Sequence, residues 1–157
     1  MSLVYLISKF EGFLAKNLEI LFTRIPDTII RKNKNASFEI IFKSKNLDEI
    51  IDRVIGDEIS KIFRKDIEDI NDDYKEFAKL DLSKEIDWTQ LKEFFYRRNI
   101  ILHNNGKTNL IYKEKTGSTA NKVQLSVDED YLLKAIDLFE KYSNIVATHF
   151  KNKFVKS

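Results

Sequence analysis

Apolar side chains recur at helical spacing over four long stretches of the chain, residues 4–22, 46–80, 88–106 and 126–150. A spacing of three and four residues gives each helix one apolar face, and helices of this kind bury their faces against one another. The pattern therefore predicts an all-α fold, an antiparallel bundle of four to five helices. The number depends on the second stretch, which is either one helix or two helices broken near Gly56 or Arg64.

Capping residues mark the starts of three of these helices. Asn46, Asp87 and Ser126 each stand three residues before a Glu or Gln, which is the spacing of a capping box. The Asn-Asn-Gly run at 104–106 is a helix stop signal, so the third helix has two marked ends. No capping residue precedes the first apolar face, which starts almost at Met1. The first helix is therefore expected to be either the trimmed end of a longer one, from an excised domain, or a short native start.

Two of the segments between helices have their own patterns. Pro26 and the basic residues 31–35 predict an exposed segment, which either contacts phosphates or is a solvated connection. The stretch 37–42, SFEIIF, is either a short strand or a buried turn. Residues 109–112 and 122–127 alternate partly around a Thr-Gly-Ser turn, which predicts a small β-hairpin insertion before the last helix.

Composition narrows the class of protein. The 157 residues are enough for a single domain, 1–157, and 43% of them are hydrophobic. One proline and four glycines favour long helices, and a net charge of +2 means that any nucleic-acid site is local. The absence of cysteine excludes disulfides and fits a cytoplasmic protein. No apolar run approaches the length of a membrane span, and no signal peptide is recognisable, so no membrane partner is expected.

The third helix carries the polar residues that call for an explanation. Asn99 and His103 are four residues apart and stack on one face, whereas Arg98 and His103 are five apart, about 140° around the axis. A guanidinium donates hydrogen bonds to phosphate oxygens, and an imidazole can take or give a proton near pH 7. The pair is therefore the minimum for phosphodiester chemistry without a metal. In the structural alternative, Arg98 pairs with an acid and His103 caps its own helix.

These residues also carry a resemblance to a known family. Residues 97–106, RRNIILHNNG, resemble the RxxxxH signature of HEPN domains, in which a polar residue follows the arginine. Residues 8–14, SKFEGFL, and 62–65, IFRK, look like the RiboL-PSP-HEPN branch, so the resemblance spans most of the chain. It implies an active cleft at a dimer interface and an acidic residue of the first helix, here Glu11, near the site. Alternatively, Glu11 is a solvated side chain on the polar face.

Taken together, the residues and the resemblance predict a metal-independent endoribonuclease. The ribose 2'-hydroxyl attacks the adjacent phosphorus, His103 transfers a proton and Arg98 stabilises the phosphoryl oxygens, which leaves a 2',3'-cyclic phosphate. Asn99 orients the imidazole or binds phosphate. One arginine and one histidine make a sparse centre, whereas a homodimer supplies two of each. The resemblance further implies a role in prokaryotic defence or a toxin–antitoxin stress response.

The alternative function is a non-catalytic HEPN module. Such a module binds nucleotide or RNA, or dimerises and receives a partner protein such as an antitoxin or a fused domain. The presence of both Arg98 and His103 favours the enzyme, because a pure scaffold needs neither.

The remaining polar residues have simpler interpretations. Lys107, Lys113 and Lys115 follow the third helix directly and either contact RNA backbone or blunt the edge of the hairpin. The acidic run at 66–76 is interpreted as a solvated helix face, and His149 as a structural residue near a helix end. No Gly-rich phosphate loop, zinc-spaced histidine set or serine-centred triad occurs, so neither a metal nor a cofactor is expected.

Overall fold

The computed structural model describes residues 2–30, 36–119 and 122–155, and the prediction of an all-α bundle is confirmed. In these residues the chain forms eight α-helices, the 3-10 helix η1 (Leu82–Lys84) and the π-helical turn η2 (Lys151–Val155). The α-helices are α1 (Leu3–Arg24), α2 (Asp27–Ile30), α3 (Phe38–Lys43), α4 (Leu47–Ile62), α5 (Ile67–Phe77), α6 (Trp88–His103), α7 (Leu110–Thr116) and α8 (Glu129–Phe150). None of the helices described combines the length and the apolar character needed to cross a bilayer.

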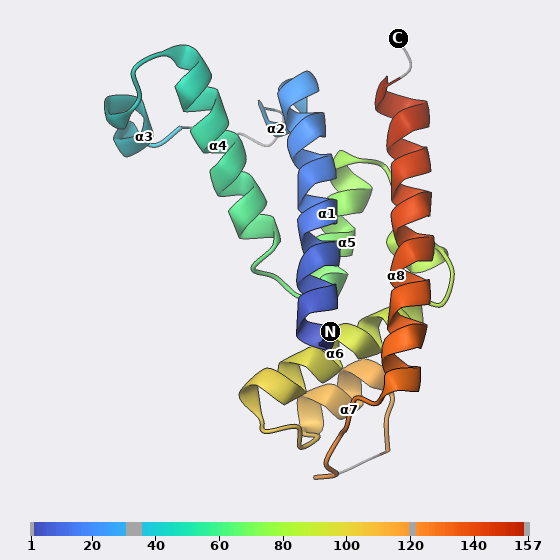
Figure 1. Cartoon of the computed structure of the whole chain (residues 1–157). Helices are drawn as coiled ribbons and strands as arrows, with labels where there is room; N and C mark the ends of the chain where they lie inside the picture. The colour runs from blue at the N-terminus through green and yellow to red at the C-terminus, as the bar shows by residue number, and fades with distance from the viewer. Residues whose placement is uncertain (1, 31–35, 120–121, 156–157) are drawn as a thin grey trace.

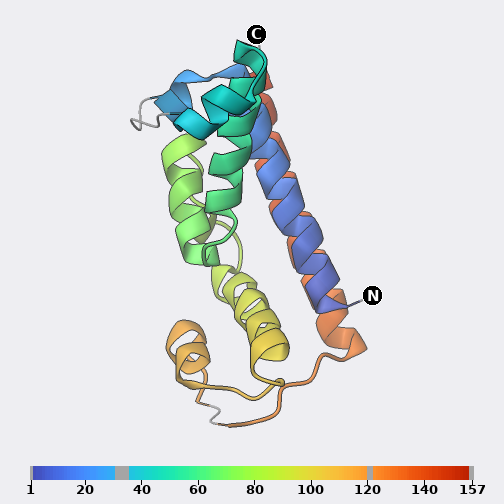
Figure 2. The same ribbon diagram turned by 90° about the vertical axis from the view of Figure 1, so that its left-hand side faces the viewer.

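The long helices alternate in direction along the chain. In Figure 1, α1 runs upward, α4 downward, α5 upward, α6 obliquely downward and α8 upward. The first and last helices therefore run in the same direction, and they pack side by side. The helix α6 crosses the lower ends of α1 and α8, and α7 packs against α6 at that end of the molecule (Figure 2).

The core lies where α1 packs against its neighbours. Phe10 stands in the middle of α1, stacked on Phe139 of α8 at 4.9 Å between ring centroids and edge-on to Phe95 of α6 at 6.4 Å. The Tyr74 side chain of α5 is fully buried, and its hydroxyl donates to the carbonyl oxygen of Leu14 at 2.6 Å. That hydrogen bond satisfies the polar group that the ring takes out of water. The first helix is thus the element on which α5, α6 and α8 assemble.

The helix boundaries agree with the sequence pattern in the middle of the chain and differ at its start. The second stretch is two helices, α4 and α5, and the break falls at Arg64, while Gly56 lies inside α4. The first helix was expected to lack a cap, and this is wrong. The Ser2 hydroxyl accepts a hydrogen bond from the backbone N–H of Tyr5 at 3.3 Å.

Two of the three predicted N-caps are confirmed. The side chains of Asn46 and Asp87 accept hydrogen bonds from the backbone N–H three residues later, at 2.9 and 3.2 Å. The third prediction is wrong, because Asp128 and not Ser126 caps α8. The Asp128 carboxylate accepts from the N–H of Tyr131 at 2.8 Å.

The stretch 37–42 is neither a strand nor a buried turn. It forms the short helix α3, capped by Ser37, and no residue of α3 is buried. Phe38 and Phe42 are 80 and 84% exposed, because α3 and the adjoining end of α4 lean away from α1 (Figure 1). The basic residues 31–35 lie outside the described residues.

The predicted β-hairpin before the last helix is wrong. Its first half forms α7, because the Asn109 side chain caps the helix by accepting from the N–H of Tyr112 at 2.9 Å, and Gly117 ends it at φ 71°. These two boundary residues outweigh the β-forming side chains between them. A single antiparallel bridge, between Lys107 and Gln124, is the only β pairing in the described part of the chain.

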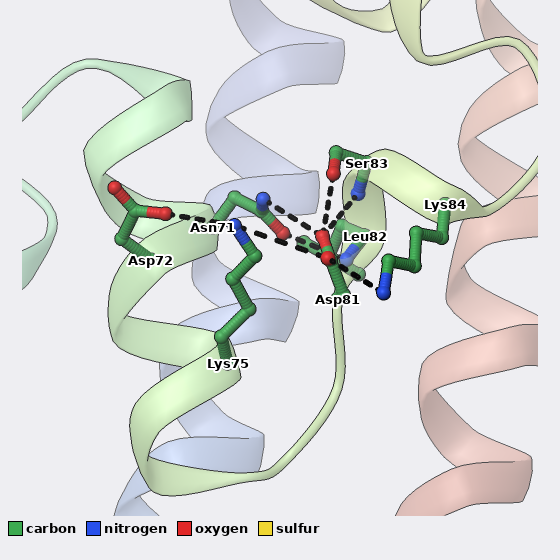
Figure 3. A network of polar contacts seen from close by, with 7 residues as sticks. All are labelled: Asn71, Asp72, Lys75, Asp81, Leu82, Ser83 and Lys84. Carbon is green, nitrogen blue, oxygen red and sulfur yellow. Dashed lines mark hydrogen bonds and ion pairs between the residues drawn. The ribbon is translucent and has the colours of Figure 1, made fainter.

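A polar network joins α5 to η1 and fixes the turn that leads into α6 (Figure 3). Asn71 is buried; its side-chain oxygen accepts from the N–H of Leu82 at 2.7 Å, and its nitrogen donates to Asp81 at 3.1 Å. The Ser83 hydroxyl donates to the same Asp81 oxygen at 2.6 Å. This bond is the main reason that the pKa of Asp81 lies below its usual value, with the Asn71 amide acting in the same direction.

Candidate functional site

The helix α6 carries two rows of polar side chains that face in different directions. Glu93 and Arg97 form one row, and Asn99 and His103 form the other. The members of each row are four residues apart, so they lie one helical turn above each other. The two rows have the same spacing, but they differ in whether neighbouring residues provide hydrogen-bond partners.

The first row, Glu93 and Arg97, is fully partnered. The Glu93 carboxylate accepts hydrogen bonds from Arg97 Nε at 2.7 Å, from the Tyr112 hydroxyl at 2.5 Å and from the Tyr131 hydroxyl. Arg97 also donates to the carbonyl oxygen of Ser126 at 2.8 Å and lies over the Tyr131 ring. Burial and the bond to Glu93 raise the pKa of Tyr112 to about 12. This row, which we call the closed row, ties α6 to α7 and α8.

The second row, Asn99 and His103, is open. His103 is exposed at the last residue of α6, and Asn99 is half-buried one turn earlier. Neither side chain has a hydrogen-bond partner among the residues that the structure describes, so His103 does not cap its own helix there. Both line a groove of ≈ 390 Å³ between α6 and α7, together with Asp66, Ile100, Asn109 and Ile111. A groove of this size is within the range of small-ligand sites.

Arg98 points away from this groove. Its Nη2 lies 3.1 Å from Glu11 Oε1 of α1, and both side chains are 19% exposed. Glu11 is therefore an ion-pair partner of Arg98 and not a solvated side chain. Arg98 Nε is buried without an acceptor among the described residues, and its guanidinium lies over the Phe95 ring. The structure thus brings Arg98 to Glu11 and His103 to Asn99, and within one chain the two pairs do not share a cleft.

The turn after His103 requires glycine. Gly106 has φ +73°, and its N–H donates to the carbonyl oxygen of Ile100 at 3.0 Å, which closes the end of α6. A Cβ at this position would lie 2.3 Å from Nε2 of Gln124. The same Gln124 nitrogen donates to the carbonyl oxygen of Asn105 at 2.8 Å. The predicted helix stop is therefore present, and the turn that it forms is hydrogen-bonded to the Gln124 side chain.

The three lysines predicted to contact RNA have different surroundings. Lys115 Nζ lies 2.8 Å from Glu68 Oε2 of α5. Because this ion pair balances its charge, Lys115 is not freely available to contact phosphate. Burial tends to raise the pKa of Glu68, but hydrogen bonds from Lys115 and Tyr96 outweigh it, and the net change is downward. Lys107 is exposed and lines a hollow next to the groove, together with Lys122, while Lys113 is half-buried on α7.

The sequence interpretation missed Asp66 as a groove residue. Asp66 is exposed at the start of α5, in the run interpreted as a solvated acidic face, and it makes no capping hydrogen bond to its own helix. Only the packing of α5 against α6 brings it beside His103. No local signal marks it, because an aspartate before a helix normally indicates a cap.

The second histidine has a structural setting. His149 Nε2 lies 2.8 Å from the carbonyl oxygen of Ala78, and the ring contacts Phe150 and Phe154. No group of three or more His, Asp or Glu side chains within 2–30, 36–119 and 122–155 is arranged to hold a metal ion.

Comparison of the chain with protein-family models, with curated proteins and with solved structures gives no match. The resemblance to HEPN domains therefore stays a prediction from the sequence, carried above all by the segment 97–106.

Proposed function

We propose that this protein is a metal-independent endoribonuclease of the HEPN type, with His103 as its proton-transfer group. The open row carries the proposal. His103 is exposed on the rim of a groove and has no partner in the part of the chain described, whereas Arg97 and Arg98 both have carboxylate partners. An imidazole that serves neither the core nor a helix end is available for acid–base chemistry.

In the proposed reaction the ribose 2'-oxygen attacks the adjacent phosphorus, and the bond from phosphorus to the 5'-oxygen breaks. One His103 imidazole accepts the proton of the 2'-hydroxyl, and a second, protonated His103 gives a proton to the departing 5'-oxygen. The Arg98 guanidinium donates to the phosphoryl oxygens, where negative charge develops. The products are a 2',3'-cyclic phosphate and a 5'-hydroxyl. Asn99 orients the imidazole or binds the phosphate.

The proposal includes a homodimer, because one chain turns Arg98 and His103 in different directions. Leu102 and Leu110 are 50 and 70% exposed around the end of α6, and a second copy that covers them removes apolar surface from water. A two-fold axis at this end supplies two copies of each catalytic side chain. A guanidinium has five N–H donors, so Arg98 can contact a phosphate while it stays paired with Glu11.

The biological part of the proposal follows from the resemblance. We place the enzyme in the cytoplasm. There it cleaves RNA as part of prokaryotic defence or of a toxin–antitoxin stress response. An antitoxin or a fused partner protein controls it.

The second candidate function is a non-catalytic module that binds RNA, nucleotide or a partner protein. The ion pair between Arg98 and Glu11 favours it, because the carboxylate weakens the attraction of the guanidinium for phosphate. The buried Arg98 Nε favours the enzyme, because a buried donor without an acceptor is uncommon and calls for a functional explanation.

Cleavage of a labelled mixed-sequence RNA in excess EDTA tests the proposal. The parent, His103→Ala and Arg98→Ala are compared at matched purity, with circular dichroism as the check of folding. We expect cyclic-phosphate ends from the parent and loss of cleavage in both variants. Absence of cleavage at concentrations where the dimer forms, or cleavage that survives both substitutions, would contradict the enzyme and favour the binding module.

Mixing the two inactive variants tests the composite site. A heterodimer of Arg98→Ala with His103→Ala keeps one arginine for the phosphate and one histidine for one of the two proton transfers, a combination that neither homodimer has. We therefore expect the mixture to regain a small part of the activity. Mass spectrometry shows whether the subunits have exchanged. Exchange without any gain in cleavage would contradict a site shared between two chains.

A further inference from the structure

The groove beside His103 differs chemically from a phosphate site. Its rim carries the Asp66 carboxylate and the amides of Asn99 and Asn109. A carboxylate repels phosphate and accepts hydrogen bonds from neutral N–H groups. Of the basic side chains nearby, Lys115 is paired with Glu68, and Lys107 and Lys122 line the adjoining hollow instead. The groove therefore suits a nucleobase, and the hollow suits the backbone that leads to it.

The polar groups of the groove have spare hydrogen-bonding capacity. Asp66 is exposed and makes no hydrogen bond or ion pair with any described residue, which leaves two carboxylate oxygens as acceptors. The half-buried Asn99 amide has no partner in the same residues. The Asn109 side-chain oxygen accepts from Tyr112, so its nitrogen keeps the donors. The groove thus offers a pair of acceptors together with amide donors.

We propose that this groove binds a guanine base of single-stranded RNA, beside the phosphodiester on which His103 acts. The Watson–Crick edge of guanine has two adjacent donors, N1–H and N2–H, and one acceptor, O6. The Asp66 carboxylate accepts from both donors, and the amide nitrogen of Asn109 donates to O6. The inference rests on the proposed function for the position of the groove next to the scissile bond.

The same edge chemistry rejects the other three bases. Adenine and cytosine place a ring-nitrogen acceptor beside their amino group, and uracil places a carbonyl on each side of its N–H. Each of them would set an acceptor against the carboxylate and leave it without its second hydrogen bond. Single-stranded RNA presents this edge freely, which a duplex does not.

The apolar part of the groove supplies the contact for the flat faces of the base. Ile100 is buried beneath the groove, while Ile111 of α7 is 62% exposed at its edge. A volume of ≈ 390 Å³ is at the small end of the range for ligand pockets, which fits one base better than a longer segment of RNA.

Binding of uncleavable RNA tests the inference separately from catalysis. Four fluorescent 2'-O-methyl pentanucleotides that differ only in the central base are titrated with the full chain, and anisotropy is measured. The 2'-O-methyl group blocks the attacking oxygen. We expect the guanine oligonucleotide to bind about tenfold tighter than the other three, the effect of one two-bond base contact.

Two aspartates of α5 give a matched pair of variants. Asp66→Asn removes the pair of carboxylate acceptors. We expect this variant to bind the guanine oligonucleotide about as tightly as the other three, so that the preference is lost. Asp69 lies one turn after Asp66, is exposed and does not line the groove. Asp69→Asn removes the same charge as Asp66→Asn, and the preference for guanine should persist. Equal binding of all four oligonucleotides, no binding of any, or a preference unchanged in Asp66→Asn would overturn the inference.

The two proposals fail in different ways. Guanine-selective binding that depends on Asp66, with no cleavage of unmodified RNA, would keep the base site and remove the ribonuclease. Cleavage that depends on His103 but cuts equally at all four bases would keep the ribonuclease and remove the base site.

Discussion

The closed and open rows of α6 show how one helix serves the fold and the proposed site at once. The closed row, Glu93 and Arg97, receives partners from α7, α8 and the segment before α8. The open row, Asn99 and His103, has the same spacing and receives none from the residues described. Polar groups that are taken out of water need hydrogen-bond partners. The hydrogen bonds of the closed row therefore contribute to the stability of the fold. The open row is free to bond a ligand.

The difference implies that stability and function are separable along this helix. Changes in the closed row should lower the free energy of unfolding, and changes in the open row should lower cleavage without that loss.

Glu93→Gln should lower the free energy of unfolding by about 3 kcal/mol, because it leaves Arg97 without a carboxylate in a mostly buried setting. Urea denaturation followed by circular dichroism measures the change. Glu140→Gln, on an exposed part of α8, is the control. A loss in Glu93→Gln no larger than that of the control would contradict the structural role of the closed row.

Gly106→Ala should lower the free energy of unfolding by about 2 kcal/mol, since it combines a positive φ with displacement of the Gln124 amide, which then loses its hydrogen bond to the Asn105 carbonyl oxygen. Gly117→Ala isolates the first cause, because that residue has φ +71° and nothing within 4 Å of an added Cβ. We expect it to cost about 1 kcal/mol. Thermal unfolding of both variants gives the comparison, and equal losses would argue against the close packing of Gln124 on the turn after His103.

Asn99→Ala should reduce the rate of RNA cleavage about tenfold, the effect of one hydrogen bond to a charged group. Its stability should be unchanged, because Asn99 has no partner among the described residues to lose. Asn71→Ala is the opposite case: its buried amide holds Leu82 and Asp81, so stability should fall while cleavage by the folded protein persists. If Asn99→Ala lost stability and not rate, the open row would be structural.

Glu68→Gln should change the response of stability to acid. The pKa of Glu68 is lowered from 4.5 in the folded chain, so its contribution to stability is present above pH 4.5 and is lost as the pH falls through the folded value. The parent should therefore lose more stability than Glu68→Gln between pH 6 and about pH 3.5. Glu114→Gln on α7 is the control, and parallel curves for all variants would contradict the prediction.

Helical periodicity was sufficient to predict the long helices, and cap residues located several of their ends. Asp87 and the Asn-Asn-Gly run mark α6 correctly, since the chemistry of a helix end is local. The hairpin prediction is wrong at α7, although Asn109 and Gly117 are also local signals. Partial alternation of side chains favours a strand there, and the two helix caps outweigh it.

The partners of the candidate residues could not be predicted in the same way. Periodicity places Arg98 and His103 about 140° apart, but it does not show that Glu11 of α1 pairs with the arginine. Asp66 joins the groove only through the packing of α5 on α6. Such contacts between distant segments depend on how the helices cross, which one sequence does not specify.

The two histidines of the chain separate the proposed catalytic role of His103 from a structural role most directly. His103→Ala and His149→Ala are assayed for RNA cleavage in EDTA and for the free energy of unfolding in the same preparations. We predict that His103→Ala loses cleavage at least 100-fold, about the effect of one acid–base group, at unchanged stability. His149→Ala should lose about 1 kcal/mol of stability, with its bond to Ala78, and keep cleavage. Cleavage that survives in His103→Ala would contradict the role of His103 as the proton-transfer group.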